Sequence, residues 1–288
     1  MSPKQEEMDT DLGQPISYGR TSEIYAWKEG QILKLFYDWF GLDNIESEAR
    51  ITRAVSNSGF PVPDVGEILR VNNRHGLVYQ RVYGESMWRI IRHKPWYAVR
   101  YARRCAELQA ELHGSTIHVD LPRQRQKLID RISQNESIPV HIRSRALEEL
   151  ETMPDEDRLC HGDFWPGNIL MTSQGEIIID WLHASLGNPL ADVSRTSILC
   201  LGGAETRQFR RPFLSLGTTK ISQFLNPFIK LFLHTAHIAY LRHYFEVRPG
   251  GVDEYHRWLP IMVTERLSDN IPELEKWLME QLEKRNRQ

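Results

Sequence analysis

The apolar residues of the chain change their spacing near Gly84. Before this residue, runs rich in β-branched and aromatic side chains, such as Ser22–Lys28 and Gln31–Tyr37, predict strands separated by tight turns. After it, apolar residues recur mainly at intervals of three or four, which is typical of helices with one buried face. A chain with strands first and helices afterwards is expected to form an α+β fold, in which an antiparallel sheet precedes a helical region.

Two local patterns refine this division. A helix is predicted inside the strand region, from about Asp43 to Ser56, because apolar residues there recur at helical spacing. Two further strands, Val65–Val71 and Gly76–Val82, flank the turn Asn72-Asn73. Inside the helical region, residues 159–179 form a small island of short strands and turns.

The composition is that of an ordinary globular protein. The chain has 288 residues, of which 41% are hydrophobic and 26% are charged, so the disordered, collagen-like and coiled-coil classes are excluded. Lys and Arg number 36 against 38 Asp and Glu, and a net charge of −2 gives no support for a nucleic-acid or membrane partner. The most apolar stretch, Phe224–Leu241, is interrupted by Lys230, so we expect a buried helix there and no membrane span.

The cysteines and the N-terminal residues bear on location. Cys105, Cys160 and Cys200 are far apart and lack paired metal-ligand spacing, so we expect reduced thiols in a cytoplasmic protein. Residues 1–14 are polar and acidic, with no apolar stretch of the kind found in secretory signals. We expect them to form a disordered tail.

The strand-rich island carries the residues with the clearest chemical meaning. It reads HGDFWPGN over residues 161–168, and after a turn an Ile-Ile-Ile strand ends at Asp180. Asp163, Asn168 and Asp180 offer short oxygen-bearing side chains of the kind that Mg²⁺ prefers, with water and phosphate as its other ligands. A carboxylate beside such a metal can accept the proton of a substrate hydroxyl during phosphoryl transfer. One Asp in a Pro-Gly loop is more often a turn former, but the three groups together favour catalysis. His161 is expected to be a structural hydrogen-bonding residue.

The string His-Gly-Asp, four residues and Asn, followed by a hydrophobic strand ending in Asp-Trp, resembles the catalytic and metal loops of the aminoglycoside phosphotransferase family. This family is the small-molecule branch of the protein-kinase fold, and the resemblance extends from about Ser17 to Asp192. It implies that Asp163 is the catalytic base and that Asn168 and Asp180 bind Mg²⁺.

The resemblance also implies a bilobal protein-kinase-like fold. The N-lobe, residues 15–83, would be a five-stranded antiparallel sheet with one helix that covers the nucleotide. The mostly helical C-lobe, residues 84–288, would hold the catalytic loop, the metal site and the acceptor-binding helices.

Lys34 lies in the apolar run Ile32–Phe36 and needs a counter-charge, which Glu48 on the following helix can supply. The resemblance makes Lys34 the contact to the α- and β-phosphates of the nucleotide and Glu48 its partner. Taken alone, a strand Lys usually faces solvent. Glu46 is the competing partner, but residues two apart on a helix face different ways.

Two further segments correspond to nucleotide-binding parts of the fold. The turn between the first two strands contains Arg20, Thr21 and Ser22, whose backbone amides are candidates for phosphate binding. The strand that ends before Gly84 resembles the interlobe hinge, where the backbone of Gln80 and Val82 would bond the nucleotide base. Backbone contacts do not select the base, so ATP is expected and GTP is not excluded.

The chain departs from the family pattern after Asp180. The family usually has Asp-Trp-Glu at this point, whereas this chain has Asp180-Trp181-Leu182. The family then usually has Gly-Asp-Pro, whereas this chain has Gly187-Asn188-Pro189. Ion pairs made by the missing carboxylates are therefore in doubt. Asp192 matches a family Asp, and we expect it to accept hydrogen bonds from the backbone near His161.

We expect an ATP-dependent phosphotransferase acting on a small-molecule alcohol, as a monomer or homodimer. The alternatives are a catalytically silent kinase-like nucleotide-binding protein and a true aminoglycoside kinase. Residues 193–288 contain 14 Lys and Arg against 10 Asp and Glu, so a highly cationic acceptor is not expected. Five carboxylates and one aromatic residue of this part are candidates for meeting an amine, and none is assigned to the site: Glu246, Asp253, Glu254, Glu265, Asp269 and Trp258.

Overall fold

The computed structural model describes residues 7–8, 10–115, 120–203 and 219–285. The chain divides into two compact units. The N-terminal unit comprises Met1–Ser86, His118–Leu121 and Asn168–His183, and the C-terminal unit comprises Met87–Ile117, Pro122–Gly167 and Ala184–Gln288.

The N-terminal unit is built on a six-stranded sheet with the order β1-β5-β6-β4-β3-β2. The strands are β1 (Glu7–Met8), β2 (Ser17–Tyr18), β3 (Ser22–Ala26), β4 (Gln31–Phe36), β5 (Val65–Val71) and β6 (Arg74–Gln80). Strands β2 to β6 pair antiparallel, which confirms the expected five-stranded antiparallel sheet. The short β1 pairs parallel with β5.

Strand β1 lies within residues 1–14, where a disordered tail is expected from the sequence. Glu7 pairs with Arg70 and Met8 with Val71, so this part of the segment is ordered by the sheet edge. The backbone N–H of Thr10 also donates to the side chain of Asn72, 3.0 Å away. An open strand edge offers backbone partners to any nearby segment, which composition alone does not reveal.

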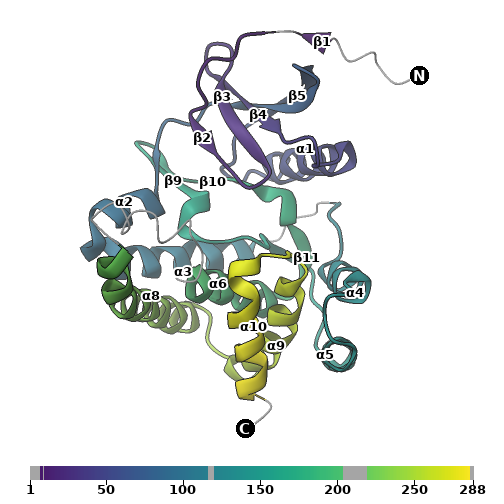
Figure 1. The fold of residues 1–288 in the computed structure, drawn as a ribbon, viewed down its shortest axis with the longest axis vertical. Coiled ribbons are helices and arrows are strands. Elements are labelled where there is room, and N and C mark those ends of the chain that lie inside the picture. The colour runs from purple at the N-terminus through teal and green to yellow at the C-terminus, as the bar shows by residue number, and fades with distance from the viewer. Residues whose placement is uncertain (1–6, 9, 116–119, 204–218, 286–288) are drawn as a thin grey trace. The chain divides into compact units, whose positions relative to one another are not determined.

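Helix α1 (Leu42–Asn57) packs on one face of this sheet (Figure 1). Alternation along β4 sends Leu33 and Leu35 into a cluster on one face, whereas Phe36 joins the cluster with α1 on the other. Lys34 therefore belongs to the face that α1 covers. The hairpin between β5 and β6 turns at Asn72 and Asn73, both with positive φ, as a two-residue type I′ turn requires.

A second, three-stranded sheet belongs to the same unit and has the order β10-β9-β7. Its strands are β7 (Glu85–Ser86), β9 (Ile169–Thr172) and β10 (Gly175–Ile178). The contacts thus place residues 168–183 with the N-terminal unit, whereas the sequence-based division puts everything after residue 83 in the C-lobe. The reason is that β9 pairs with β7, while Trp181 meets the ring of Phe60 edge to face.

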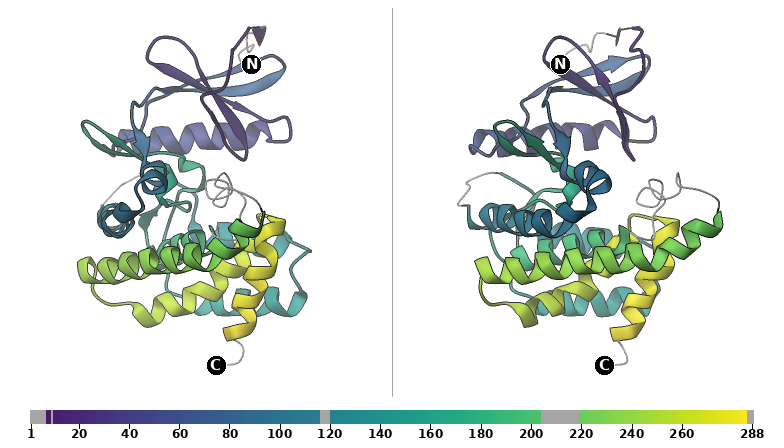
Figure 2. Two further views of the ribbon diagram at one scale, coloured as in Figure 1. Left: turned by 60° about the vertical axis from the view of Figure 1, so that its left-hand side comes forward. Right: turned by 90° about the vertical axis from the view of Figure 1, so that its left-hand side faces the viewer.

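The C-terminal unit is mostly helical (Figure 2). Its α-helices are α2 (Met87–His93), α3 (Ala98–Gly114), α4 (Gln124–Gln134), α5 (Val140–Thr152), α6 (Pro189–Gly202), α8 (Thr219–Val247), α9 (Val252–Leu267) and α10 (Pro272–Arg285). Strands β8 (Arg158–Cys160) and β11 (Ser185–Gly187) form a small antiparallel sheet. Helix α3 packs along α8, and α6 packs along α9.

Helix α8 includes the apolar stretch for which we expect a buried helix. Leu233, Tyr240 and Tyr244 are buried, whereas Leu231 and Ile238 are 63% and 52% exposed. The helix therefore buries one face and exposes another. In the described ranges, no helix combines the length and the apolar character that crossing a membrane requires.

Candidate active site

Lys34 makes the central contacts of the N-terminal unit. Its Nζ lies 2.6 Å from Glu48 Oε1 and 3.1 Å from Asp180 Oδ1, and its side chain is 11% exposed. Strand β4 lies between β3 and β6 in the sheet, so Lys34 is not at an edge and its side chain is held against α1. The predicted ion pair between Lys34 and Glu48 is confirmed.

Burial and charge act in opposite directions on this ammonium group. Burial lowers the pKa of Lys34, but the carboxylates of Asp180 and Glu48 outweigh this effect and hold the pKa above its ordinary value. Burial also raises the pKa of Glu48, against the opposing effect of Lys34. Lys34 is therefore a permanent cation, and its position is fixed by two acidic side chains.

Tyr79 is a second hydrogen-bond partner of the Glu48 carboxylate, and the sequence does not reveal it. Its hydroxyl donates to Glu48 Oε1 over 2.7 Å, and burial together with Glu48 raises the pKa of Tyr79 well above its ordinary value. The hydroxyl therefore remains a donor. An aromatic residue in a strand is usually a core residue, so no sequence signal marks this role.

Asp180 lies two residues after the end of β10, with φ of 66° and a side chain that is 40% exposed. A left-handed conformation is uncommon for a non-glycine residue and is found most often where function requires it. The backbone N–H of Ile179 donates to the carbonyl of Asn168 over 2.9 Å, which joins the two segments that carry the predicted metal ligands. A carboxylate and an amide oxygen are donors that suit Mg²⁺.

The predicted catalytic loop, residues 161–167, belongs to the C-terminal unit and carries Asp163. Asp192 accepts hydrogen bonds from the backbone N–H of His161 (3.2 Å) and of Gly162 (2.7 Å), as predicted. The backbone N–H of Asp163 donates to His161 Nδ1 over 3.2 Å, so the histidine is a structural partner of the loop. The structure therefore anchors the loop immediately before Asp163.

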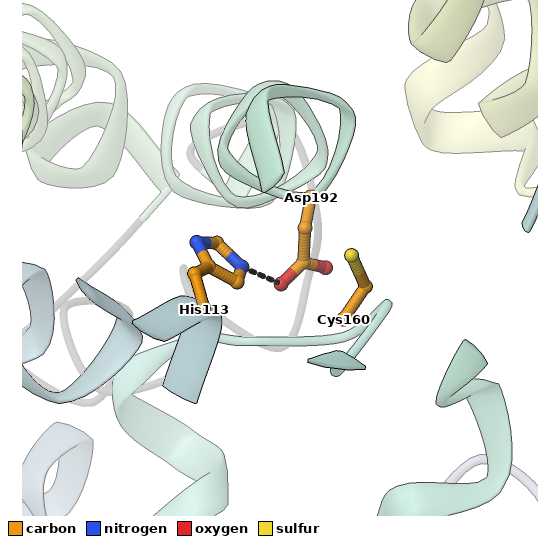
Figure 3. A group of neighbouring side chains, drawn as sticks. All are labelled: His113, Cys160 and Asp192. Carbon is orange, nitrogen blue, oxygen red and sulfur yellow. Dashed lines mark hydrogen bonds and ion pairs between the residues drawn. The ribbon is translucent and has the colours of Figure 1, made fainter. Parts of the chain in front are cut away.

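Asp192 is the centre of a buried hydrogen-bond network, part of which is drawn in Figure 3. His113 Nε2 lies 3.1 Å from Asp192 Oδ2, His113 Nδ1 lies 2.8 Å from the Tyr244 hydroxyl, and Gln109 Nε2 donates to Asp192 over 2.9 Å. Burial alone would raise the pKa of Asp192, but the hydrogen bonds from His113 and Gln109 lower it to about 2.

Cys160 completes a group of three side chains whose spacing could suit a metal ion (Figure 3). Their chemistry does not favour one. Both ring nitrogens of His113 already have partners, and burial raises the pKa of the Cys160 thiol well above its ordinary value. A metal-binding cysteine must be a thiolate, so we interpret this group as structural.

Asn188 stands where the family usually has Asp, and the structure gives a reason. Its side-chain oxygen accepts from Leu190 N over 2.8 Å and caps α6. Its amide nitrogen donates to Glu254 Oε1 (2.7 Å) and Glu156 Oε1 (3.1 Å). A carboxylate could not donate to two glutamates, so the amide matches its surroundings.

The predicted nucleotide-contacting segments lie in the N-terminal unit. The backbone N–H of Gly19 donates to the Ser22 carbonyl over 2.8 Å, which closes the turn that contains Arg20 and Thr21. Gln80 ends β6, and Val82 follows it in extended chain. Within this unit the structure brings together Lys34, Glu48 and Asp180, and the contacts of residues 20–22, Gln80 and Val82 to a nucleotide stay a prediction.

Comparison with known proteins identifies the family. The model of the Phosphotransferase enzyme family (APH) matches residues 40–218, and curated protein sequences give no match. Among solved structures, the apo form of a thermostable mutant of aminoglycoside phosphotransferase APH(4)-Ia is similar, with a TM-score of 0.60 and 16% identity over 95% of this chain and 93% of that chain. Aminoglycoside-3'-phosphotransferase of type VIII has a TM-score of 0.54 and 20% identity, over 88% and 91% of the two chains. These similarities confirm the protein-kinase-like fold, and the match to the family model covers more than half of the sequence, so the chain belongs to the Phosphotransferase enzyme family.

Proposed function

We propose that the protein transfers the γ-phosphoryl group of ATP to a hydroxyl group of a small molecule. Membership of the Phosphotransferase enzyme family supports the class of reaction. The observation that carries the assignment of roles is the position of Lys34, whose Nζ contacts both Glu48 and Asp180. A cation fixed in this way can hold phosphate oxygens without first having to be ordered.

In this proposal, Lys34 binds the α- and β-phosphates and Glu48 keeps it in place, with Tyr79 holding Glu48. Asn168 and Asp180 would hold Mg²⁺, which when bound neutralises charge on the phosphates. Backbone groups of residues 20–22 would contact the phosphates, and those of Gln80 and Val82 the base. Base contacts through the backbone leave GTP as a second possible donor.

Asp163 would act on the acceptor. Its carboxylate accepts the proton of the acceptor hydroxyl, whose oxygen forms a bond to the γ-phosphorus. The bond between the γ-phosphorus and the bridging oxygen breaks, and the nucleoside diphosphate leaves with its electron pair. The hydrogen bonds from His161 and Gly162 to Asp192 fix the loop that presents Asp163.

Two variants distinguish the proposed role of Asp163 as base from that of Asp180 as metal ligand. We expect Asp163→Asn to leave nucleotide binding nearly intact and to lower turnover by about 10²-fold or more, because a positioned base contributes about 10²–10⁴-fold. We expect Asp180→Ala to abolish magnesium-dependent nucleotide binding as well. Calorimetric titration with ATP measures binding, and magnesium-dependent nucleotide consumption with a panel of alcohols measures turnover.

Asp130→Asn is the matched control, because Asp130 is an exposed aspartate of the same unit and is not among the acceptor candidates. It should change neither measurement. Wild-type turnover by Asp163→Asn would show that another group is the base. Nucleotide binding without consumption by the wild type, across the panel of alcohols, would favour the catalytically silent alternative.

The structure supports an acceptor that is not highly cationic. Of the five carboxylates considered for an amine, Glu265 and Asp269 pair with Arg195, and Glu246 pairs with Arg242. A fourth, Glu254, accepts hydrogen bonds from Asn188 and Trp258. Steady-state assays with kanamycin beside neutral alcohols test this, and efficient turnover of kanamycin, at kcat/KM of about 10⁴ M⁻¹s⁻¹ or more, would contradict it.

A further inference from the structure

The C-terminal unit contains a pocket between helices α2, α3, α6 and α8 that the proposed function does not yet use. It offers about 50 Å³ to the centres of water-sized atoms, several times the space that one water needs, and it is open at its mouth. Ile91, Leu233 and two tryptophans, Trp88 and Trp165, contribute to a lining that is almost entirely apolar. Among the described residues that line it, none is Asp, Glu, Lys or Arg.

The pocket adjoins the catalytic loop. Trp165 lines it and follows Asp163 by two residues, while Phe164 between them is fully buried. A Cβ added to Gly167 would lie about 2 Å from the Trp165 ring, so the ring lies directly over this glycine. The ring centroids of Trp165 and Trp88 are 6.3 Å apart. The indole of Trp165 is therefore a fixed wall of the pocket, next to the proposed base in the chain.

The two hydroxyl groups in the lining are committed to other partners, whereas His237 Nε2 is not. The hydroxyls of Thr196 and Tyr240 both bond to the side chain of Gln109. His237 lines the pocket and is 7% exposed, and its Nε2 has no hydrogen-bond partner among the described residues. A buried polar atom without a partner is rare in folded proteins and calls for an explanation, such as a ligand.

His237 is also uncharged. Burial, with a smaller effect of His234, lowers the pKa of His237 to about 4. A neutral imidazole can donate or accept one hydrogen bond at Nε2 without a counter-ion. The pocket thus offers apolar walls and one neutral polar group, and it offers no carboxylate to a cationic ligand.

We propose that this pocket binds the acceptor, and that the acceptor is an uncharged alcohol with an aromatic or alicyclic body. The body packs against the rings of Trp88 and Trp165 on the pocket side, and one polar atom of the acceptor bonds to His237 Nε2. This assignment rests on the proposed function, since it names the substrate class of the same enzyme. Its first test needs no turnover.

The probe is 2-naphthalenemethanol, titrated without nucleotide and followed by calorimetry or by quenching of tryptophan fluorescence. We expect Ala236→Trp, which places an indole in the pocket from α8, to weaken binding at least tenfold. Ile238→Trp is the matched control, because Ile238 lies two residues away on α8 and is 52% exposed. It should bind as the wild type does. Ala102→Leu, on α3, narrows the same pocket and serves if Ala236→Trp fails to fold.

The role of His237 has its own comparison. We expect His237→Phe to weaken binding of 2-naphthalenemethanol about fivefold and to leave binding of 2-methylnaphthalene, which lacks the hydroxyl, nearly unchanged. His234→Phe, at an exposed position on the same helix, should change neither. If His237→Phe weakened binding of the two ligands equally, the proposed hydrogen bond to His237 Nε2 would be contradicted.

The two proposals fail in different ways. Absence of binding of 2-naphthalenemethanol, or binding that Ala236→Trp and Ala102→Leu leave unchanged, would overturn the pocket assignment even in an active kinase. Preferred binding of kanamycin would overturn it too. Binding at the pocket without nucleotide consumption for any alcohol of the panel would overturn the proposed function and leave the pocket as a ligand site. Phosphorylation of other alcohols, but of no aromatic or alicyclic one, would overturn the pocket as the acceptor site of an active kinase.

Discussion

The hydrogen bonds of Asp192 make a quantitative prediction about stability. In Asp192→Asn, one carboxylate oxygen becomes an NH₂ group that faces donors. The side chain accepts from the backbone N–H groups of His161 and Gly162 and from Gln109 Nε2, and it contacts His113 Nε2. The substitution should therefore remove acceptors and bring donors against each other in a fully buried site.

The magnitude follows from the number of bonds and from the pKa. Leaving a buried donor unsatisfied costs about 1–3 kcal/mol, and the new NH₂ group must face at least one donor, the Gly162 N–H if it replaces Oδ1, so we expect Asp192→Asn to lower the free energy of unfolding by at least about 1–3 kcal/mol near pH 7. The folded pKa of Asp192 is lowered to about 2 from an ordinary 3.8, which at about 1.4 kcal/mol per pKa unit corresponds to roughly 2 kcal/mol of stability. A lowered folded pKa stabilises the protein above the unfolded pKa. This contribution is complete above about pH 5 and is lost as the pH falls from 3.8 toward 2.

Urea denaturation of the wild type and of Asp192→Asn, from pH 7 down to the lowest pH at which both fold, measures this difference. The gap between the two free energies of unfolding should be constant above pH 5 and should narrow below pH 4. The control is Asp253→Asn, at an exposed position. A gap below about 1 kcal/mol at pH 7, or one that widens as the pH falls, would refute the reasoning.

Three more predictions follow from buried groups. Lys34→Met and Glu48→Gln should each weaken ATP binding. Each should also lower the free energy of unfolding, because removing one partner of a buried ion pair costs about 3–5 kcal/mol. In urea denaturation, the loss in the double variant Lys34→Met/Glu48→Gln should be smaller than the sum of the losses in the two single variants. Gly84→Ala should lower the melting temperature, because a Cβ there would lie 2.6 Å from a backbone carbonyl oxygen of β9; unchanged melting would contradict this contact. Cys160 and Cys200 should resist iodoacetamide at pH 8 in the folded protein and react in urea, because burial raises the pKa of both thiols, to about 12 for Cys200.

The sequence predicts those parts of the site in which a polar residue stands in an improbable place. Lys34 inside an apolar strand needs a counter-charge, and the helical spacing of the next segment offers Glu48. Asp192 follows a Pro at the start of a helix, and its link to the backbone near His161 also came from the resemblance to the family. For Lys34 the cost of burying an unpaired charge makes the partner predictable, whereas the role of Asp192 rests on the resemblance alone.

The sequence pattern does not indicate the roles of other residues. Tyr79 reads as a core residue of β6, and only the packing of α1 on the sheet puts its hydroxyl within reach of Glu48. The ordering of Glu7–Met8 depends on a strand edge formed by residues more than 60 positions away. His237 is one of three interruptions in an apolar helix, and its lack of a partner emerges only when α3, α6 and α8 are packed together.

The charged residues of the C-terminal unit show why a net charge count cannot by itself predict the acceptor. The positive balance of residues 193–288 argues against a cationic acceptor, but it does not say which charges can meet a ligand. The structure replaces that count with pairings: Arg195 is 3% exposed and pairs with Glu265 and Asp269, and Arg131 pairs with both carboxylates as well. Charges neutralised in pairs contribute little to the field at a distance. The acceptor preference is therefore expected to depend on the uncharged pocket that contains His237 and Trp165, whose lining no net charge could predict.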